Sequence, residues 1–173
     1  MMRLLGLVVS LWILAAPQSL APYVPSPPDV VERMLALGQV TNADVVYDLG
    51  CGDGRIPITA AKKYGARGVG LDIDPRRIEE SRANAKIAGV ERLVEFRVED
   101  VMKADVSRAT LVTLYLLSSS NAKLRPMLQK QLRPGARIVS HAFSMGPDWP
   151  ADTIDQFTTV RGDEITLYLW RIK

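Results

Sequence analysis

The run Asp48–Arg55, with the sequence DLGCGDGR, constrains the fold more than any other stretch of the chain. It follows the apolar, β-branched segment 45–47 and precedes a helix-like segment at 56–64. A strand, a glycine-rich turn and a helix in this order are typical of a nucleotide-binding unit, because glycines let the backbone approach a ligand closely and a helix start offers unpaired N–H groups. Glycine stands at positions 50, 52 and 54, and Arg55 occupies the position where the dinucleotide pattern G-x-G-x-x-G needs its third glycine. The run therefore predicts a nucleotide site that is not a dinucleotide site; the alternative is a tight turn without a ligand.

Predicted strands and helices alternate around this run. Short apolar segments predict strands at 45–49, 68–73, 93–98, 110–117, 137–143, 156–161 and 164–172. Apolar residues at helical spacing predict helices at 27–37, 55–64, 75–88 and 121–132, with Ser26 and Asp74 as N-caps and with Pro126 interrupting or restarting the last one. This order predicts an α/β protein with a doubly wound, Rossmann-like, seven-stranded sheet, mostly parallel with an antiparallel C-terminal hairpin.

Composition limits the possible chemistry. The 173 residues suffice for one domain whose core needs no metal or disulfide, and we expect a monomer. The net charge of +3 comes from scattered basic residues, so charge gives nucleic-acid binding no support. Cys51 and His141 are each the single residue of their type, which excludes an internal disulfide and argues against a histidine triad and any bound metal. His141 is interpreted as a hydrogen-bonded structural histidine.

Acidic residues fall at the predicted strand ends. Asp72 ends the second strand and Asp100 follows the third, so both gather with the glycine run at one edge of the sheet. Asp72 can accept hydrogen bonds from the two hydroxyls of a ribose. Asp100 can accept one from the amino group of adenine, whose ring would lie against Ile73. These positions predict an adenosine-containing ligand.

The acids within the glycine run indicate the charge of that ligand. Carboxylates at Asp48 and Asp53 would repel a phosphate, whereas they would attract an ammonium or sulfonium group. An adenosine with a positively charged tail is S-adenosyl-L-methionine, which we predict as the cofactor.

Residues 45–143 resemble the class I S-adenosylmethionine-dependent methyltransferases. The resemblance rests on DLGCGDGR, on GLDIDP at 70–75, on Asp100 and on LRPGARIV at 132–139. More narrowly, YVPSP at 23–27 and TLYLLSSSNAKLRP at 113–126 resemble the small lysine methyltransferases of archaea and mitochondria, the group of the ATP synthase c-subunit lysine methyltransferase. This resemblance implies transfer of a methyl group to lysine side chains of a protein, which could be a membrane protein.

The resemblance also implies roles for matching positions. Gly50, Gly52 and Gly54 would cradle the methionine end of the cofactor, supported by Asp48, while Asp72 would hold the ribose and Asp100 the adenine. Tyr115 would border the transferred methyl group, and the proline-rich arm would cover the pocket as a lid through Tyr23 and Pro25. Asp53 is a weak candidate for a general base. Tyr115 could instead pack between strand and helix.

Two other functions stay open. A methyltransferase could act on a small molecule or a nucleic acid, although the chain lacks the Asn/Asp-Pro-Pro-aromatic tetrapeptide that many base-amino methyltransferases use. A non-catalytic nucleoside-binding module could retain the same fold, although the complete glycine run, Asp72 and Asp100 disfavour this.

The N-terminal residues follow a different pattern. Arg3 precedes a run at 4–16 that is apolar apart from Ser10, and Pro17 ends it. Thirteen residues suit the core of a signal peptide and are short for a membrane span. We predict a signal peptide or signal-anchor at 1–21, a proline-rich arm and N-terminal helix at 22–44, and a methyltransferase domain at 45–173. Because the cofactor is made in the cytosol, we expect a membrane-associated protein with its domain on the cytoplasmic side.

Overall fold

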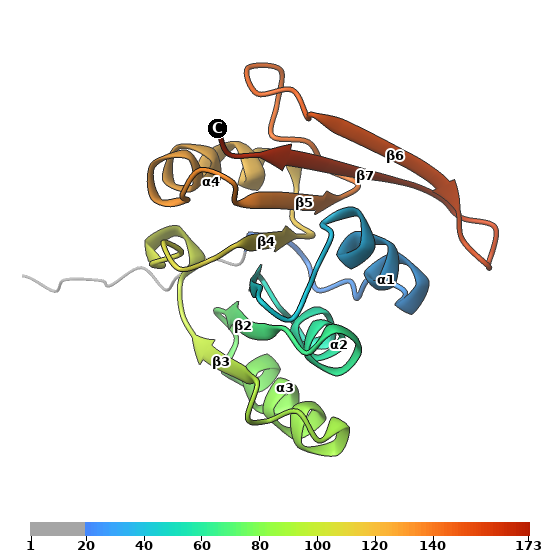
Figure 1. Ribbon diagram of the computed structural model, residues 1–173, viewed down its shortest axis with the longest axis vertical. Coiled ribbons are helices and arrows are strands. Elements are labelled where there is room, and N and C mark those ends of the chain that lie inside the picture. The colour runs from blue at the N-terminus through green and yellow to red at the C-terminus, as the bar shows by residue number, and fades with distance from the viewer. Residues whose placement is uncertain (1–19) are drawn as a thin grey trace, which may run out of the picture.

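The computed structural model describes residues 20–173, so nearly all of the predicted signal or anchor segment lies outside the described residues. The described residues form one seven-stranded sheet in the order β3-β2-β1-β4-β5-β7-β6 (Figure 1). The strands are β1 (Val45–Leu49), β2 (Arg67–Asp72), β3 (Val94–Val98), β4 (Leu111–Leu114), β5 (Arg137–His141), β6 (Thr153–Thr158) and β7 (Glu164–Arg171). The helices are α1 (Pro28–Leu37), α2 (Arg55–Tyr64), α3 (Pro75–Ala88), α4 (Ser118–Gln131) and the short 3₁₀ helix η1 (Val101–Lys103).

The sheet confirms the predicted fold class. Strands β1 to β5 pair in parallel, whereas β7 runs antiparallel to both β5 and β6. Helices α1, α2 and α3 cover one face and α4 covers the other (Figure 1). The chain therefore leaves β1 toward one face and β4 toward the other, and the crevice between these neighbouring strands is the switch point at which α/β sheets bind ligands.

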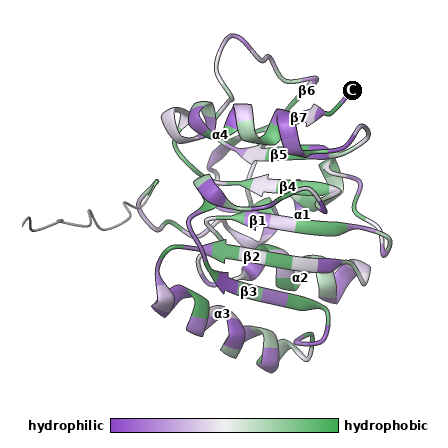
Figure 2. Ribbon diagram, turned by 90° about the vertical axis from the view of Figure 1, so that its left-hand side faces the viewer, coloured by the Kyte–Doolittle hydropathy of each residue, from purple (hydrophilic) through white to green (hydrophobic). Residues whose placement is uncertain are grey.

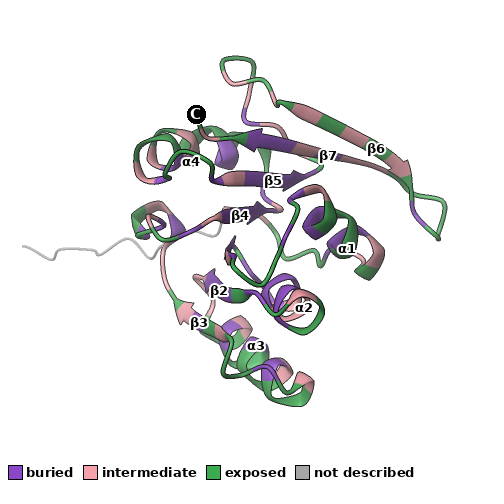
Figure 3. Ribbon diagram, viewed as in Figure 1, coloured by how far each residue is buried: buried purple, intermediate pink, exposed green. Residues whose placement is uncertain are grey.

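Successive side chains of the central strands point to opposite faces of the sheet, so the core has a part on each face. On β1, Val46 packs with α1 and α2, whereas Tyr47 and Leu49 point to the face that α4 covers through Leu124 and Leu128. The strand interiors are mostly hydrophobic in Figure 2. Figure 3 shows β4 buried along its length, while the edge strand β6 alternates between intermediate and exposed residues. The central strands thus form a rigid support beneath the switch point.

Three local predictions were wrong. Ser26 does not cap α1: its N-cap is Pro27, without a side-chain hydrogen bond, and the Ser26 hydroxyl is used elsewhere. Strand β4 ends at Leu114 and α4 begins at Ser118, because the apolar residues between them turn into the ligand side of the sheet instead of extending the strand. Pro126 lies inside a continuous α4. It is exposed there, so water can satisfy the carbonyl group that it leaves without an N–H partner.

Other boundaries moved little. Strands β1 and β5 begin, and helices α2 and α3 begin and end, where the sequence predicts. Strand β6 begins three residues before its predicted start, at Thr153. Within residues 20–173, no helix is both long and apolar enough to cross a membrane.

Candidate functional site

A pocket of about 570 Å³ opens at the carboxyl ends of the parallel strands. Its walls come from the ends of β1, β2 and β4, from the residues after β3, and from residues 20–26 of the segment 20–27, which we call the strap. In the described part of the chain, six acidic residues line it against three arginines: Asp48, Asp53, Asp72, Asp74, Glu99 and Asp100 against Arg55, Arg76 and Arg77. The pocket is therefore electronegative, as a positively charged ligand requires.

The glycine loop after β1 has a geometry that side chains would not permit. Gly50 and Gly52 have φ angles of 85° and 54°, in the left-handed region. A Cβ atom on Gly52 would lie 2.5 Å from the ring of Tyr23. The N–H groups of Gly50 and Cys51 both donate to the carbonyl oxygen of Leu71, at 2.8 and 2.9 Å, which fixes the loop to the neighbouring strand. Gly50 and Gly52 line the pocket, where the sequence predicts the cofactor cradle.

Gly54 has a different environment. It is the N-cap of α2 with φ of 79°, and a Cβ atom there would lie 2.7 Å from the Phe96 ring and 2.9 Å from Cβ of Ser81. Among the described residues it packs behind the loop and is not part of the pocket lining. Glycine at this position is explained by the close packing of α2, α3 and β3.

Asp72 braces the loop from the end of β2. Its Oδ2 accepts a hydrogen bond from the Gly52 N–H at 3.0 Å, and its Oδ1 accepts one from the Asp74 N–H at 2.9 Å. Each carboxylate oxygen has a further lone pair for a ligand hydroxyl. Asp72 thus holds the cradle in shape at the position where the sequence predicts the ribose contact.

Asp100 and Ile73 line the same wall of the pocket. Asp100 is the N-cap of η1, and its Oδ1 accepts a hydrogen bond from the Met102 N–H at 3.0 Å. This bond leaves the Asp100 Oδ2 with only a long ion pair to Lys103, at 3.8 Å. Both residues therefore line the pocket, and their contacts with adenine stay a prediction.

Asp48 is the most deeply buried acid of the pocket. Desolvation by burial raises its pKa to about 7, against the opposing effect of a 2.7 Å hydrogen bond from the Thr113 hydroxyl. Nearby Asp72 and Asp53 raise the pKa further. A cation bound beside Asp48 would favour its ionised form. Burial also raises the pKa of the Cys51 thiol, which makes this cysteine a packing residue and not a nucleophile.

The strap crosses the pocket and is fixed near both of its ends. At the first end, the Ser120 hydroxyl donates to the carbonyl oxygen of Leu20 at 2.6 Å. At the second, Arg55 Nη1 donates to the carbonyl oxygen of Ser26 at 2.7 Å. Between them, the Tyr23 ring lies against Gly52, with the guanidinium of Arg77 3.9 Å from its centroid. Tyr23 and Pro25 thus line the pocket from the strap, as a lid would.

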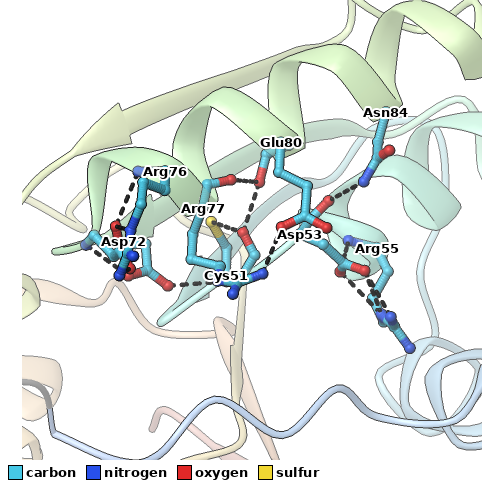
Figure 4. A network of polar contacts seen from close by, with 11 residues as sticks. Cys51, Asp53, Arg55, Asp72, Arg76, Arg77, Glu80 and Asn84 are labelled. Atoms are coloured by element: carbon cyan, nitrogen blue, oxygen red, sulfur yellow. Dashed lines mark hydrogen bonds and ion pairs between the residues drawn. The ribbon is translucent and has the colours of Figure 1, made fainter.

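An ion pair positions Arg55 for this contact. The Asp53 carboxylate accepts hydrogen bonds from Arg55 Nε and Nη2, at 2.9 and 2.6 Å (Figure 4). Burial acts to raise the pKa of Asp53, but the hydrogen bonds and charge of Arg55 outweigh it and the pKa is lowered. Asn84 holds the same turn by donating to the Asp53 carbonyl oxygen at 3.0 Å (Figure 4). A carboxylate engaged in this way is better suited to hold the strap than to accept a proton.

Tyr115 lines the pocket directly after β4. Its ring stacks on the imidazole of His141, with centroids 3.8 Å apart and planes 26° apart. Phe143 lies on the same aromatic cluster, 6.3 Å from Tyr115. The exposed apolar residues Tyr23 and Leu117 lie on the same pocket lining. The side of the pocket next to Tyr115 is therefore aromatic and apolar, in contrast to the acidic side.

Several residues of this site were missed by sequence reasoning. Ser26, Arg55 and Ser120 fix the strap, and Arg77 stacks on it. Ser26 and Ser120 stand within the motifs YVPSP and LLSSSN, whereas Arg55 and Arg77 stand in or beside the cofactor motifs; none of the four carries a local signal of its contact with the strap. The contacts themselves join residues too distant in the sequence for spacing to reveal them.

Comparison with known proteins decides the family. Residues 48–153 match the family described as the ANTKMT methyltransferase domain. A protein-lysine N-methyltransferase of Saccharolobus islandicus is 47% identical over 125 residues, which cover 72% of this chain and 78% of that protein. The chain belongs to the ANTKMT methyltransferase family.

Other relatives support the cofactor. An ATP synthase c-subunit lysine N-methyltransferase of Xenopus laevis is 32% identical over 156 residues, which cover 86% of this chain and 68% of that protein. A solved structure from Salinibacter ruber, described as an RNA methyltransferase in complex with S-adenosyl-L-homocysteine, is 54% identical with a TM-score of 0.80, covering 86% of this chain and 94% of that one. The protein is an S-adenosylmethionine-dependent methyltransferase, and the acidic glycine-loop pocket fits that cofactor.

Proposed function

We propose that this methyltransferase transfers a methyl group to lysine side chains of a protein. The observation that carries the proposal is the charge of the pocket, where six acidic residues face three arginines beside an apolar rim. Two of these arginines are neutralised within the lining, Arg55 by Asp53 and Arg76 by Asp74. A lysine ammonium would be attracted to such a pocket, whereas a phosphate group would be repelled. The lysine methyltransferases among its relatives agree with this choice.

The residues of the pocket would have separate roles in the reaction. Bound S-adenosylmethionine supplies a methyl group already activated by a sulfonium. Asp72 and Asp100 would hold its ribose and adenine, with Ile73 against the ring, and Asp48, Gly50 and Gly52 would surround its methionine end. Tyr115 and the strap border the remaining space, so they would orient the incoming amine and exclude water. The protein therefore contributes position and desolvation.

The proton of the lysine ammonium needs no buried base in this proposal. Asp53 is ion-paired with Arg55 and its pKa is lowered, so it would accept a proton poorly at neutral pH. The acidic residues of the lining favour binding of the charged lysine, and its proton would pass to water before the amine enters the apolar side. Asp53 would act by holding Arg55 against the strap.

RNA is the second candidate substrate, because the 54% identical structure from Salinibacter ruber is described as an RNA methyltransferase. An RNA substrate would bring phosphates close to the mouth of the pocket. Favourable RNA binding needs free basic residues around that mouth. Arg77, the remaining arginine of the lining among residues 20–173, is paired with Glu80 and covered by Tyr23. The charges therefore favour lysine.

The segment at 1–21 carries a proposal about location. We propose that it directs the protein to a membrane and leaves the domain on the cytoplasmic side, where the cofactor is made. A membrane protein is then an accessible substrate. Protease protection of a C-terminally tagged chain in spheroplasts tests this: digestion of the tag in intact spheroplasts would contradict the cytoplasmic side.

The substrate proposal is tested with isotopically labelled cofactor. Purified full-length protein is incubated with S-[methyl-³H]adenosylmethionine and, in parallel, with protein extract and total RNA from cells lacking the enzyme. We expect label in the protein fraction, at lysine by mass spectrometry, and none with the Asp72→Ala variant. Label in RNA would replace lysine methylation with the second candidate.

A further inference from the structure

His141 occupies a position that links the strap to the pocket. It is the single histidine of the chain and the last residue of β5, and its side chain is buried. One face of its imidazole stacks on Tyr115, with ring centroids 3.8 Å apart. Its Nδ1 lies 2.9 Å from the hydroxyl oxygen of Ser26, on the strap. The ring therefore joins the strap to the residue that follows β4.

The backbone that carries His141 is strained. Ala142 has φ of 63°, in the left-handed region that residues with a Cβ atom avoid, and the Phe143 N–H donates back to the His141 carbonyl oxygen at 2.8 Å. Such a tight γ-turn persists only where surrounding contacts enforce it. Strain of this kind gathers at functional sites, and here it sets the direction in which the chain leaves β5.

Three hydrogen bonds hold this turn in place. The Ala142 N–H donates to the Thr166 carbonyl oxygen on β7 at 2.8 Å. The carbonyl oxygen of Phe143 accepts from the Ser140 hydroxyl at 2.6 Å and from the Asn121 side-chain amide at 2.9 Å. Asn121 comes from the first turn of α4, which follows Tyr115 in the chain. The strained turn and the element after Tyr115 are thus fixed to each other.

Ser26 connects His141 to the ion pair of Asp53 and Arg55, which we call the latch of the strap. Ser26 is itself buried, and it uses both of its polar oxygens. Its hydroxyl meets His141, while its carbonyl oxygen accepts from Arg55, which the Asp53 carboxylate holds in place. With the strap closed, one continuous series of contacts runs from the glycine loop through Ser26 and His141 to Tyr115.

We propose that His141 is a positioning residue for methyl transfer, which fixes the ring of Tyr115 when Ser26 docks the closed strap. This inference rests on the proposed function only in taking Tyr115 as the residue that borders the methyl acceptor. It predicts that closure of the strap and orientation of the acceptor are a single event, transmitted by the imidazole.

The state of the imidazole suits this role. Desolvation by burial lowers the pKa of His141 to about 4, so the ring is neutral throughout the physiological range. A neutral imidazole stacks on a tyrosine ring without bringing a positive charge beside the sulfonium. It would also not act as a general base near pH 7, which leaves positioning as its contribution.

Kinetics on four variants test the proposal. Ser26→Ala and His141→Phe each remove the hydrogen bond, and the phenylalanine retains an aromatic ring to stack on Tyr115. We expect kcat to fall about tenfold in each, while the dissociation constant for S-adenosylmethionine, measured by calorimetry, changes less than about threefold. Because both variants break the same bond, the Ser26→Ala/His141→Phe double variant should be no slower than the slower single one. His141→Leu, which also removes the stacking, should be the slowest.

The matched control is Thr110→Val. The Thr110 hydroxyl donates to Asp44 at 2.6 Å, at the amino ends of the parallel strands. The variant therefore loses a partly buried hydrogen bond away from the pocket. It should lower the melting temperature and leave kcat within twofold. A purely structural role for His141 would make its variants behave like this control.

The single histidine permits a second readout that needs no methyl acceptor. In the full chain prepared without a polyhistidine tag, ¹H–¹⁵N correlation spectra show one imidazole, which should stay neutral from pH 5.5 to 8 and carry an upfield ring-current shift. Tyr115→Leu should abolish that shift. Ser26→Ala should change the tautomer populations.

The outcomes are distinct. Any one of three results would overturn the proposal. The first is an unchanged kcat in Ser26→Ala and His141→Phe, and the second is a double variant whose loss of kcat is the product of the two single losses. The third is an imidazole without the ring-current shift. Because kcat is measured on whichever acceptor takes the label, a switch from lysine to RNA would refute the proposed substrate and leave this test intact.

Discussion

The two halves of the pocket are assembled in different ways. In the glycine-loop half, which comprises 48–53 and Asp72, the bond from Gly52 to Asp72 spans 20 residues. In the strap half, which comprises 20–27, Tyr115 and His141, the contact of Ser26 with His141 spans 115 residues and that of Leu20 with Ser120 spans 100. The first half can form with a single βαβ unit, whereas the second requires the complete sheet. Loss of Asp72 from the first half should therefore abolish cofactor binding, whereas substitutions that displace the strap should slow methyl transfer.

The largest effect is expected for Asp72→Ala. The variant removes two hydrogen bonds that shape the cradle and the predicted ribose contact, so the affinity for S-adenosylmethionine should fall at least about 100-fold, or about 3 kcal/mol. Isothermal calorimetry measures it. Asp105→Ala, which removes a comparable bond to the Ser107 N–H outside the pocket, is the control and should bind normally. An affinity within threefold of the wild type would refute the cofactor assignment.

Gly52→Ala tests the boundary between the halves. The new Cβ atom would lie 2.5 Å from the Tyr23 ring at a φ of 54°, so the strap should be displaced and methyl transfer should fall about 20-fold. Gly89→Ala is the matched control, because φ there is 69° with no atom within 4 Å. It should cost only the backbone strain, about 1 kcal/mol of stability. Adding Tyr23→Ala to Gly52→Ala should restore part of the rate; no recovery would place the damage in the loop itself.

Asp53 and Arg55 distinguish a latch from a base. If they hold the strap as a pair, Asp53→Asn, Arg55→Met and the double variant should each slow methyl transfer by about tenfold, with an unchanged pH profile. Arg33→Met, which breaks the exposed ion pair with Asp155, is the control and should leave the rate of methyl transfer unchanged. A 100-fold loss in Asp53→Asn alone, with a lost acidic limb in the rate profile, would restore Asp53 as a base.

The smallest effect on cofactor binding concerns pH. Because the pKa of Asp48 is raised to about 7 in the folded protein, the folded state holds an extra proton between about pH 4 and pH 7. Its contribution to stability therefore falls as pH rises through this window, by at most about 1.4 kcal/mol per unit, and is constant above it. A cationic cofactor should bind with release of that proton, so its affinity should rise about threefold to tenfold from pH 6 to pH 7.5.

Asp48→Asn is the control for this prediction. It removes the titrating carboxyl, so its difference from the wild type isolates Asp48 from every other group that titrates between pH 4 and pH 8. Calorimetry and thermal unfolding at several pH values provide the two measurements. Equal pH dependence in the wild type and in Asp48→Asn would show that Asp48 does not titrate in this range.

The sequence predicted most of the fold because its signals are local. Asp74 caps α3 through the Arg76 N–H at 2.9 Å, and Gly65 and Gly89 end their helices in the left-handed conformation. Such caps depend on neighbours within a few residues. Prediction failed at Tyr115–Leu117, whose apolar side chains continue the pattern of β4 while the backbone leaves the sheet. An apolar pattern does not distinguish a strand from a pocket wall: Leu116 is as buried as β4, whereas Tyr115 is half-buried and Leu117 is exposed.

The residues of the candidate site likewise divide into those that a local sequence signal predicts and those that it does not. Asp48, Gly50, Gly52, Asp72, Ile73 and Asp100 were all expected in one pocket, and the structure brings them there because each ends or follows a parallel strand. Gly54 shares their pattern in the sequence but serves packing. Ser26 was predicted as a helix cap, because capping is the local use of a serine before a proline. Its partner on β5 is invisible to any local rule.

The anchoring of the strap near both ends has a consequence for turnover. A lid hinged at one end swings aside, whereas a segment fastened at Leu20 and at Ser26 admits ligands only when one fastening opens. The Ser120 fastening is a single bond between neutral groups, while the Arg55 fastening is supported by a carboxylate. Adenosylhomocysteine would therefore leave only after one of these fastenings has opened, once in every cycle.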